Sequence, residues 1–200
     1  GLIQSVGAAW LMLEMTRRAD MVALVQTSVA LPVVLFSLMG GAMADGLDRR
    51  RILLAAQGFM LVVSTGLALC AWLGLLSPWL LLGFTFLIGC GNAFNAPAWQ
   101  ASVQDMVPRP QVPAAVALNS MGFNLARSTG PAIGGTIVAS VGAAAAFVVN
   151  ALSYVALIAV LWRWRAVPGP RLLPRERLGS AMAAGLRYVL LSPTIRTVLV

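Results

Sequence analysis

Long apolar runs, separated by short polar turns, make up most of this 200-residue chain. Hydrophobic residues account for 60% of the sequence and charged residues for 10%, whereas a soluble domain carries roughly 25% charged residues. A helix that crosses a bilayer needs about 20 mostly apolar residues. Because consecutive runs of this length exceed ordinary core helices, they favour an all-α integral membrane protein over a soluble helical bundle.

The runs predict five full spans between two partial ones. The full spans are expected at residues 21–44, 52–73, 78–99, 113–140 and 143–161. Residues 1–14 are interpreted as the end of a first span that is cut short, because the chain begins with Gly1 inside apolar sequence and shows no signal peptide. We therefore expect a membrane bundle of six helices over residues 1–162. A basic linker with an amphipathic helix is expected over residues 163–193, and the start of a seventh span over residues 194–200.

The arginines indicate how the bundle is oriented. All 14 positive charges are Arg, and alternating the turns across a membrane places eleven on one side and Arg17 and Arg18 on the other. The eleven are Arg49, Arg50, Arg51, Arg109, Arg163, Arg165, Arg171, Arg175, Arg177, Arg187 and Arg196. Cytoplasmic loops of membrane proteins carry such an excess. The pattern predicts a multi-pass protein of the cytoplasmic (inner) membrane with its Arg-rich loops inside the cell, and it favours a lipid bilayer rather than nucleic acid as the partner of this basic chain.

Residues that carry enzyme chemistry are scarce. The chain has no His, and its two cysteines, Cys70 and Cys90, both lie inside apolar runs. We find no clustered carboxylates, no nucleophile beside a base and no metal-ligand spacing. The sequence therefore argues against an enzyme, and we expect no catalytic residue, no metal site and no cofactor.

One turn concentrates charge. In GGAMADGLDRRRIL, residues 40–53, five charges fall within seven residues. Gly41 is expected to allow close backbone approach at the end of the second span. Asp45 lies where that helix leaves the membrane, and a carboxylate there is costly unless it is paired, most often with Arg. The alternative is a turn that fixes membrane topology and does nothing more.

The fifth span, ALNSMGFNLARSTGPAIGG over residues 117–135, carries a polar stripe. Small and polar residues recur at steps of three or four and share one helix face; they are Ser120, Asn124, Arg127, Ser128, Pro131 and Gly135. Lipid disfavours such a stripe, so it should face protein or a water-filled cavity. Gly130 and Gly134 form a G-x-x-x-G pair, which permits tight helix contact.

Arg127 is open to two interpretations. As a functional residue it is a cavity cation that meets an anionic substrate group or a carboxylate. As a structural residue it hydrogen-bonds neighbouring helix carbonyls, or Asn92 and Asn95. Further candidates for the cavity are Asn124, Gln4, Gln26, Asn92 and Asn95, for which packing between helices is the alternative in each case.

Two of these motifs resemble signatures of the major facilitator superfamily. Gly41, Asp45 and Arg49–Arg51 match its loop 2–3 signature, G-x-x-x-D-[RK]-x-G-[RK]-[RK]-[RK], with departures at Gly46 and Asp48. The fifth-span antiporter signature, G-x-x-x-G-P-x-x-G-G, is matched by Gly130, Pro131, Gly134 and Gly135, with Ala126 in place of the first Gly. The wider sequence is similar to the subgroup of enterobactin-type siderophore exporters and drug efflux pumps.

The resemblance implies the N-terminal six-helix half of a twelve-helix transporter whose C-terminal half is missing from this chain. It implies a conformational latch between the halves, formed by Gly41, Asp45, Asp48, Arg49, Arg50 and Arg51, with Asp45 at its centre and Asp48 contacting a neighbouring Arg. It also implies export of small amphipathic molecules, siderophore-like or drug-like, by alternating access with proton coupling. The family's Arg signature in the fourth span is absent. A lysophospholipid or lipid flippase of the same fold, and a non-transporting membrane scaffold, are the alternatives.

Overall fold

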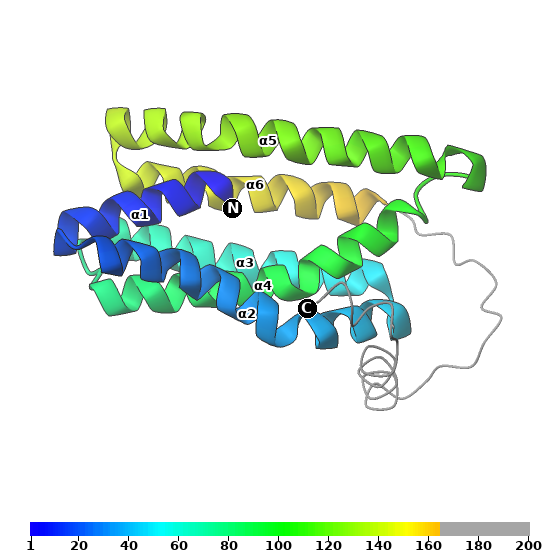
Figure 1. Ribbon diagram of the computed structural model, residues 1–200, viewed down its shortest axis with the longest axis horizontal. Helices are drawn as coiled ribbons and strands as arrows, with labels where there is room; N and C mark the ends of the chain where they lie inside the picture. Colours follow the sequence, from blue (N-terminus) through cyan, green and yellow to red (C-terminus); the bar gives the residue numbers. More distant parts are fainter. Residues whose placement is uncertain (165–200) are drawn as a thin grey trace, which may run out of the picture.

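A computed structural model describes residues 1–164 of the chain, and the predicted linker, amphipathic helix and seventh span lie outside these residues. The described part is helical and contains no strand. Its elements, in chain order, are α1 (Leu2–Thr16), α2 (Ala19–Gly46), α3 (Arg49–Trp72), α4 (Pro78–Val103), the short 3-10 helix η1 (Arg109–Gln111), α5 (Val112–Val141) and α6 (Ala143–Arg163). Figure 1 shows the six long helices lying roughly side by side in one bundle.

The helices follow the predicted spans closely. Within the described residues, α2, α3, α4 and α6 are long and apolar enough to cross a membrane. The 15 residues of α1 overlap the predicted partial span and extend two residues beyond it. Although α5 has 30 residues, it is not in this group, because Asn, Ser, Thr and Gly dilute its apolar residues. Four such helices in one chain are typical of a multi-pass membrane protein.

Local sequence signals set the helix ends. Asp48 begins α3 by accepting hydrogen bonds from the backbone N–H groups of Arg50 and Arg51, as an N-cap carboxylate does. Ser77 begins α4 in the same way, followed by Pro78, whose fixed φ suits the first helical position. Gly142, at φ 95°, separates α5 from α6 in a conformation that favours glycine.

The bundle is built around α4 and α3. α2 and α3 both pack along α4, and α3 packs along α6 on its other side, whereas α2 and α3 barely touch each other. A core of wholly buried residues, including Met12, Val25, Leu67, Leu81 and Phe147, joins α1, α2, α3, α4 and α6. α5 is not part of that core and lies beside α1 and α6 at the edge of the bundle (Figure 1).

Glycines set the closest helix contacts. A Cβ on Gly40 would lie 2.5 Å from the carbonyl oxygen of Ala93, and one on Gly89 would lie 2.6 Å from that of Val29. α2 and α4 therefore pack with their backbones nearly in contact. For Gly41 no described atom lies within 4 Å of the same position. The close approach expected at Gly41 is thus made by Gly40, which points in a different direction because consecutive residues are about 100° apart around a helix.

The two glycines of the G-x-x-x-G pair pack α5 against α1. A Cβ on Gly130 would lie 3.1 Å from that of Leu2, and one on Gly134 would lie 3.1 Å from the Cα of Ile3. This is the tight helix contact that their spacing predicts. Gly135 has no described atom within 4 Å of its Cβ position, and Pro131 is exposed. The four residues that resemble the antiporter signature therefore lie on two faces of α5.

Candidate functional site

The three arginines of the charged turn make three different sets of contacts. Arg49 donates through Nη1 to a carboxylate oxygen of Asp105 at 2.7 Å and to the carbonyl oxygen of Ala101 at 2.9 Å. Its Nε donates to the carbonyl oxygen of Ala44 at 3.3 Å. Arg49 therefore joins the C-terminal ends of α2 and α4 to the start of α3, at helix ends where free carbonyl groups favour a cation.

Arg50 contacts α6 instead. Its Nε and Nη2 atoms donate to the carbonyl oxygens of Leu161 and Trp162, at 2.9 and 2.7 Å. These carbonyls belong to the last turn of α6, where backbone acceptors have no partner within the helix. Together, Arg49 and Arg50 hold the ends of α2, α4 and α6 around the first turn of α3.

Asp45 and Arg51 remain at the surface of the turn. Asp45 is exposed in the last turn of α2 and makes no hydrogen bond or ion pair with another residue of the described part. The side chain of Arg51 is 88% exposed, and its Nε lies 3.7 Å from a carboxylate oxygen of Asp48. Asp48 thus contacts a neighbouring Arg in addition to capping α3. The residues that resemble the latch therefore separate into a structural group and an exposed group.

Asp105 is a charged-turn partner that sequence reasoning did not identify. It follows the end of α4 and is 56 positions from Arg49 along the chain. The available signal was that both residues belong to turns expected on the same side of the membrane. Since there is no spacing rule for a pair so far apart, only the packing of α3 beside α4 reveals the contact.

Most of the polar stripe of α5 is exposed in the described part of the chain. Arg127 is in the middle of the helix, and both Arg127 and Asn124 are exposed. Arg127 makes no hydrogen bond within residues 1–164, so the structural alternative of a bond to Asn92 or Asn95 is not realised there. Arg127 precedes Gly130 by three residues and Gly134 by seven, so it lies on the same side of α5 as the glycines that contact Leu2 and Ile3 of α1.

The two asparagines of α4 lie deeper. Asn95 accepts a hydrogen bond from Nε2 of Gln57 on α3 at 2.9 Å, and Asn92 is half-buried. The Oε1 atom of Gln57 is buried without a hydrogen-bond partner among the described residues. On the same face of α4, Trp99 donates from its indole nitrogen to the side chain of Asn119 on α5 at 3.0 Å. Asn95 thus serves first to join α3 to α4.

The two glutamines have opposite environments. Gln4 is buried and accepts a hydrogen bond from Nδ2 of Asn150 on α6, which also donates to the hydroxyl oxygen of Ser64 on α3 at 3.2 Å. Through these two hydrogen bonds, Asn150 joins α1, α3 and α6, and Gln4 is a packing contact between helices in this half. Gln26 is exposed on α2 and remains available to a cavity.

Side chains that could bind a metal ion are not grouped within the described residues. Within residues 1–164, no three His, Cys, Asp or Glu side chains come together in a group that could hold a metal ion. The acidic side chains of this part lie at or next to helix ends: Glu14, Asp20, Asp45, Asp48 and Asp105. Within residues 1–164 the middle of α5 offers one exposed cation, Arg127, to an anionic group.

The sequence of this chain is similar to those of known membrane transporters. The family described as "Transmembrane secretion effector" matches residues 1–200. The staphyloferrin A transporter of Staphylococcus aureus is 29% identical over 80% of this chain and 40% of its own length. The multidrug efflux pump Tap of Mycobacterium tuberculosis is 28% identical over 98% of this chain and 48% of its own.

A third relative has a related activity. The enterobactin exporter EntS of Shigella boydii is 30% identical over 79% of this chain and 38% of its own length. No solved structure matches at a comparable level of significance. The chain spans less than half the length of each of these relatives. With a family match over all 200 residues, a strand-free helical bundle and relatives that are transporters rather than enzymes, the chain belongs to the major facilitator superfamily of membrane transporters.

Proposed function

We propose that this chain is the N-terminal six-helix half of a secondary active transporter that exports small amphipathic molecules, siderophore-like or drug-like, across the cytoplasmic membrane. Relatives named as siderophore transporters and as drug efflux pumps support this substrate class. Transporters of this kind commonly hold their substrate near the bilayer midplane, between two repeats that rock against each other. Alternating access and proton coupling belong to this proposal.

The exposure of Arg127 in the middle of α5 is the observation that carries the proposal. The helix has 30 residues, of which Gly130, Gly134 and Val138 are buried. An Arg near the bilayer centre costs at least about 2.5–3.5 kcal/mol and marks a functional site by default. Because Arg127 has no partner within the described bundle, a second half with a water-filled cavity beside α5 accounts for its position.

The cation also suggests how a proton could be coupled to export. The acidic residues of the described part lie at or next to helix ends, away from the middle of α5. In the proposed mechanism, Arg127 therefore faces a carboxylate of the second half, or an anionic group of the substrate. Protonation of that carboxylate would release Arg127 for the substrate. Loss of the proton would restore the ion pair and displace the substrate from Arg127.

The charged turn supports the latch part of the proposal. Arg49 and Arg50 are engaged within this half, whereas Asp45 is exposed at the C-terminal end of α2. A negative charge is unfavourable there because the helix dipole places partial negative charge at that end. A cationic or N–H donor from the second half would relieve this cost in one conformation, and its withdrawal would release the halves.

An export assay in cells tests the proposal. The full-length protein is expressed in a strain that lacks its own exporters, and efflux of a catecholate siderophore and of a fluorescent cationic drug is measured. We expect Arg127→Ala to lower efflux by at least about tenfold, the loss of one charge-assisted contact, at unchanged expression. Arg17→Ala is the matched control, since it removes the same charge at a helix end.

The outcomes are distinct. Efflux at the wild-type rate in Arg127→Ala would reduce this residue to a dispensable one and remove the main support for the cavity. If deletion of the gene changes the distribution of lysophospholipid but of neither siderophore nor drug, the protein is a flippase of the same fold. If deletion changes the distribution of none of the three compounds, the proposal that the protein is a transporter is contradicted.

A further inference from the structure

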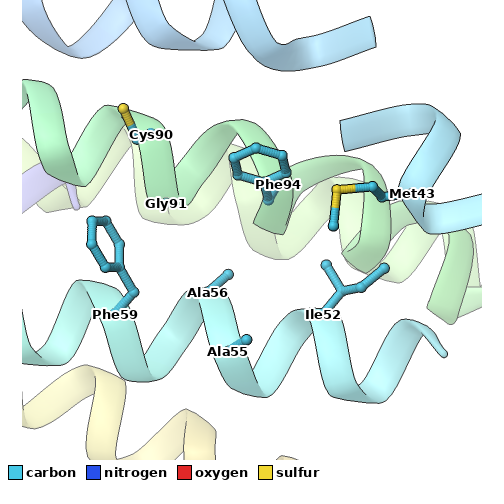
Figure 2. Close-up of a pocket in the computed structure, with 8 residues that line it drawn as sticks. All are labelled: Met43, Ile52, Ala55, Ala56, Phe59, Cys90, Gly91 and Phe94. Atoms are coloured by element: carbon cyan, nitrogen blue, oxygen red, sulfur yellow. The ribbon is translucent and has the colours of Figure 1, made fainter. Parts of the chain in front are cut away.

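An apolar pocket of about 350 Å³ lies between α2, α3 and α4, toward the end of the bundle that carries the charged turn. It exists because α2 and α3 both pack on α4 and barely touch each other, which leaves a trough over α4. Ala55, Ala56 and Gly91 line this trough, and their small size deepens it. Figure 2 shows side chains of α3 directed toward α4, with Met43 at one end of the pocket.

The pocket is open on the outer side of the bundle. Two of its α3 residues, Ala55 and Phe59, are exposed. Its wall on α4 includes Phe94, which stacks on Phe36 of α2 at a ring-centroid separation of 6.2 Å. In a membrane, the surroundings of this opening are lipid chains and not water.

The lining decides what fills the space. The residues around the pocket are aliphatic, aromatic, Gly, Met and one Cys, and they offer water no set of polar partners. An apolar cavity of roughly 150 Å³ already stays dry and takes up benzene, and this pocket is more than twice as large. An empty pocket would forfeit the dispersion contacts of its walls. Hydrocarbon is therefore the favoured occupant.

The position of the pocket matches one lipid leaflet. Arg51, Ala55 and Phe59 follow each other at steps of four and share one face of α3. At 1.5 Å per residue, Phe59 lies about 12 Å below Arg51 along the helix. One leaflet of the hydrocarbon core is about 15 Å deep, half of the full thickness. A lipid whose headgroup lies at the level of Arg51 thus has acyl carbons along the whole pocket.

Arg51 lies one helical turn before Ala55, on the same face of α3. Its side chain is 88% exposed, and its ion pair with Asp48 spans 3.7 Å between two exposed groups, a kind of pair that contributes little. Arg49 and Arg50 are bound to Asp105 and to carbonyls of α6. Asp45 is two residues beyond Met43, about 200° around α2, and so lies on the other side of that helix.

We infer that this pocket holds one acyl chain of a phospholipid from the leaflet at the α2–α3 end, with the lipid phosphate at Arg51. The lipid fills the seam that the protein's own side chains leave open between α2 and α3. It connects the two helices that carry the charged turn through a contact that neither helix makes with the other.

Lipid binding to the full-length protein tests this inference. Native mass spectrometry follows the first bound molecule as phosphatidylglycerol is titrated into the detergent-solubilised protein. Ala55→Phe fills the pocket from its exposed side, and we expect about tenfold weaker binding, since the loss of roughly two buried methylenes is enough for that. Val160→Phe is the control, because Val160 is 64% exposed on α6 and outside the pocket.

The headgroup contact has its own pair of variants. Arg51→Gln should weaken binding about fivefold, the effect of one Arg near an anionic headgroup, and Arg17→Gln at the other end of the bundle should not. Diacylglycerol with the same chains lacks the phosphate, so its affinity should be low and insensitive to Arg51→Gln. Equal loss in Ala55→Phe and Val160→Phe, or no loss in Arg51→Gln, contradicts the inference.

A photoreactive acyl chain locates the bound lipid directly. Phosphatidylglycerol with a photoreactive group near the middle of its chain should label the α3 and α4 walls of the pocket, including the peptides with Phe59 and Phe94. Ala55→Phe should lose this labelling, with helix content and melting temperature unchanged. Labels at other sites overturn the inference, and so does a drug-like substrate that labels these walls while the lipid does not.

Discussion

α4 and α5 are alike in sequence and opposite in environment. Both are long and carry an internal proline, Pro97 in α4 and Pro131 in α5. Yet α4 buries nine of its 26 residues, whereas α5 buries three of its 30. The difference teaches that small-residue motifs mark helices that make close contacts, without saying how much of the rest of the helix is covered.

The seam between α2 and α4 gives the largest expected effect. Gly40→Ala places a methyl group 2.5 Å from the carbonyl oxygen of Ala93, and we expect it to destabilise the bundle by about 3 kcal/mol, at the upper end for overpacking. Gly41→Ala meets open space, so it should stabilise the helix by about 0.5–1 kcal/mol. Thermal unfolding of both variants in detergent tests which glycine contacts α4. Equal melting temperatures would refute the assignment of this contact to Gly40.

The same experiment on α5 sharpens the comparison. Gly134→Ala crowds the Cα of Ile3, and we expect a loss of about 1–2 kcal/mol, a smaller overpacking cost because the overlap is milder. Gly135→Ala faces open space in this half, so it should leave the melting temperature unchanged or slightly higher. If the face of Gly135 meets the second half, export falls in that variant in spite of intact stability. Normal export would show that this face contacts nothing close.

In the charged turn the expected effect is of similar size but electrostatic. Arg49→Gln removes a hydrogen-bonded ion pair with Asp105 and contacts to two helix ends, and we expect a loss of about 1.5–3 kcal/mol, as for bonds to charged groups. Arg51→Gln, at an exposed side chain, should cost less than about 0.5 kcal/mol. The melting temperatures of both variants are measured. A larger loss of stability in Arg51→Gln than in Arg49→Gln would contradict the assignment of Arg49 as the structural residue and Arg51 as the exposed one.

Asp45 should affect transport and not stability. Asp45→Asn keeps the shape of an exposed side chain, so we expect a change of stability within about 0.5 kcal/mol and a severalfold slower export by the full-length protein. Asp48→Ala is the comparison, because it removes the side-chain cap of α3 and should lower stability by about 1 kcal/mol instead. Wild-type export rates in Asp45→Asn would rule out the latch.

The sequence predicted the helices well and their partners poorly. The apolar runs placed each described helix within a few residues of its ends, because a helix that crosses a bilayer needs a long continuous apolar stretch. Close contact through the spacing of Gly130 and Gly134 could also be predicted, since both lie on one face of a single helix. The pairing of Arg49 with Asp105 could not, because the two residues are separated by two helices.

Sequence alone, then, determined that this chain is a helical membrane bundle and where its charged turns fall, because both depend on local composition and on the thickness of a bilayer. Tertiary structure decided which of two adjacent glycines meets a neighbouring backbone, which arginines of RRR are held and which is exposed, and that Gln4 is buried. Those outcomes depend on the rotation of each helix about its axis. That rotation is set by the packing of the whole bundle, so no short stretch of sequence contains it.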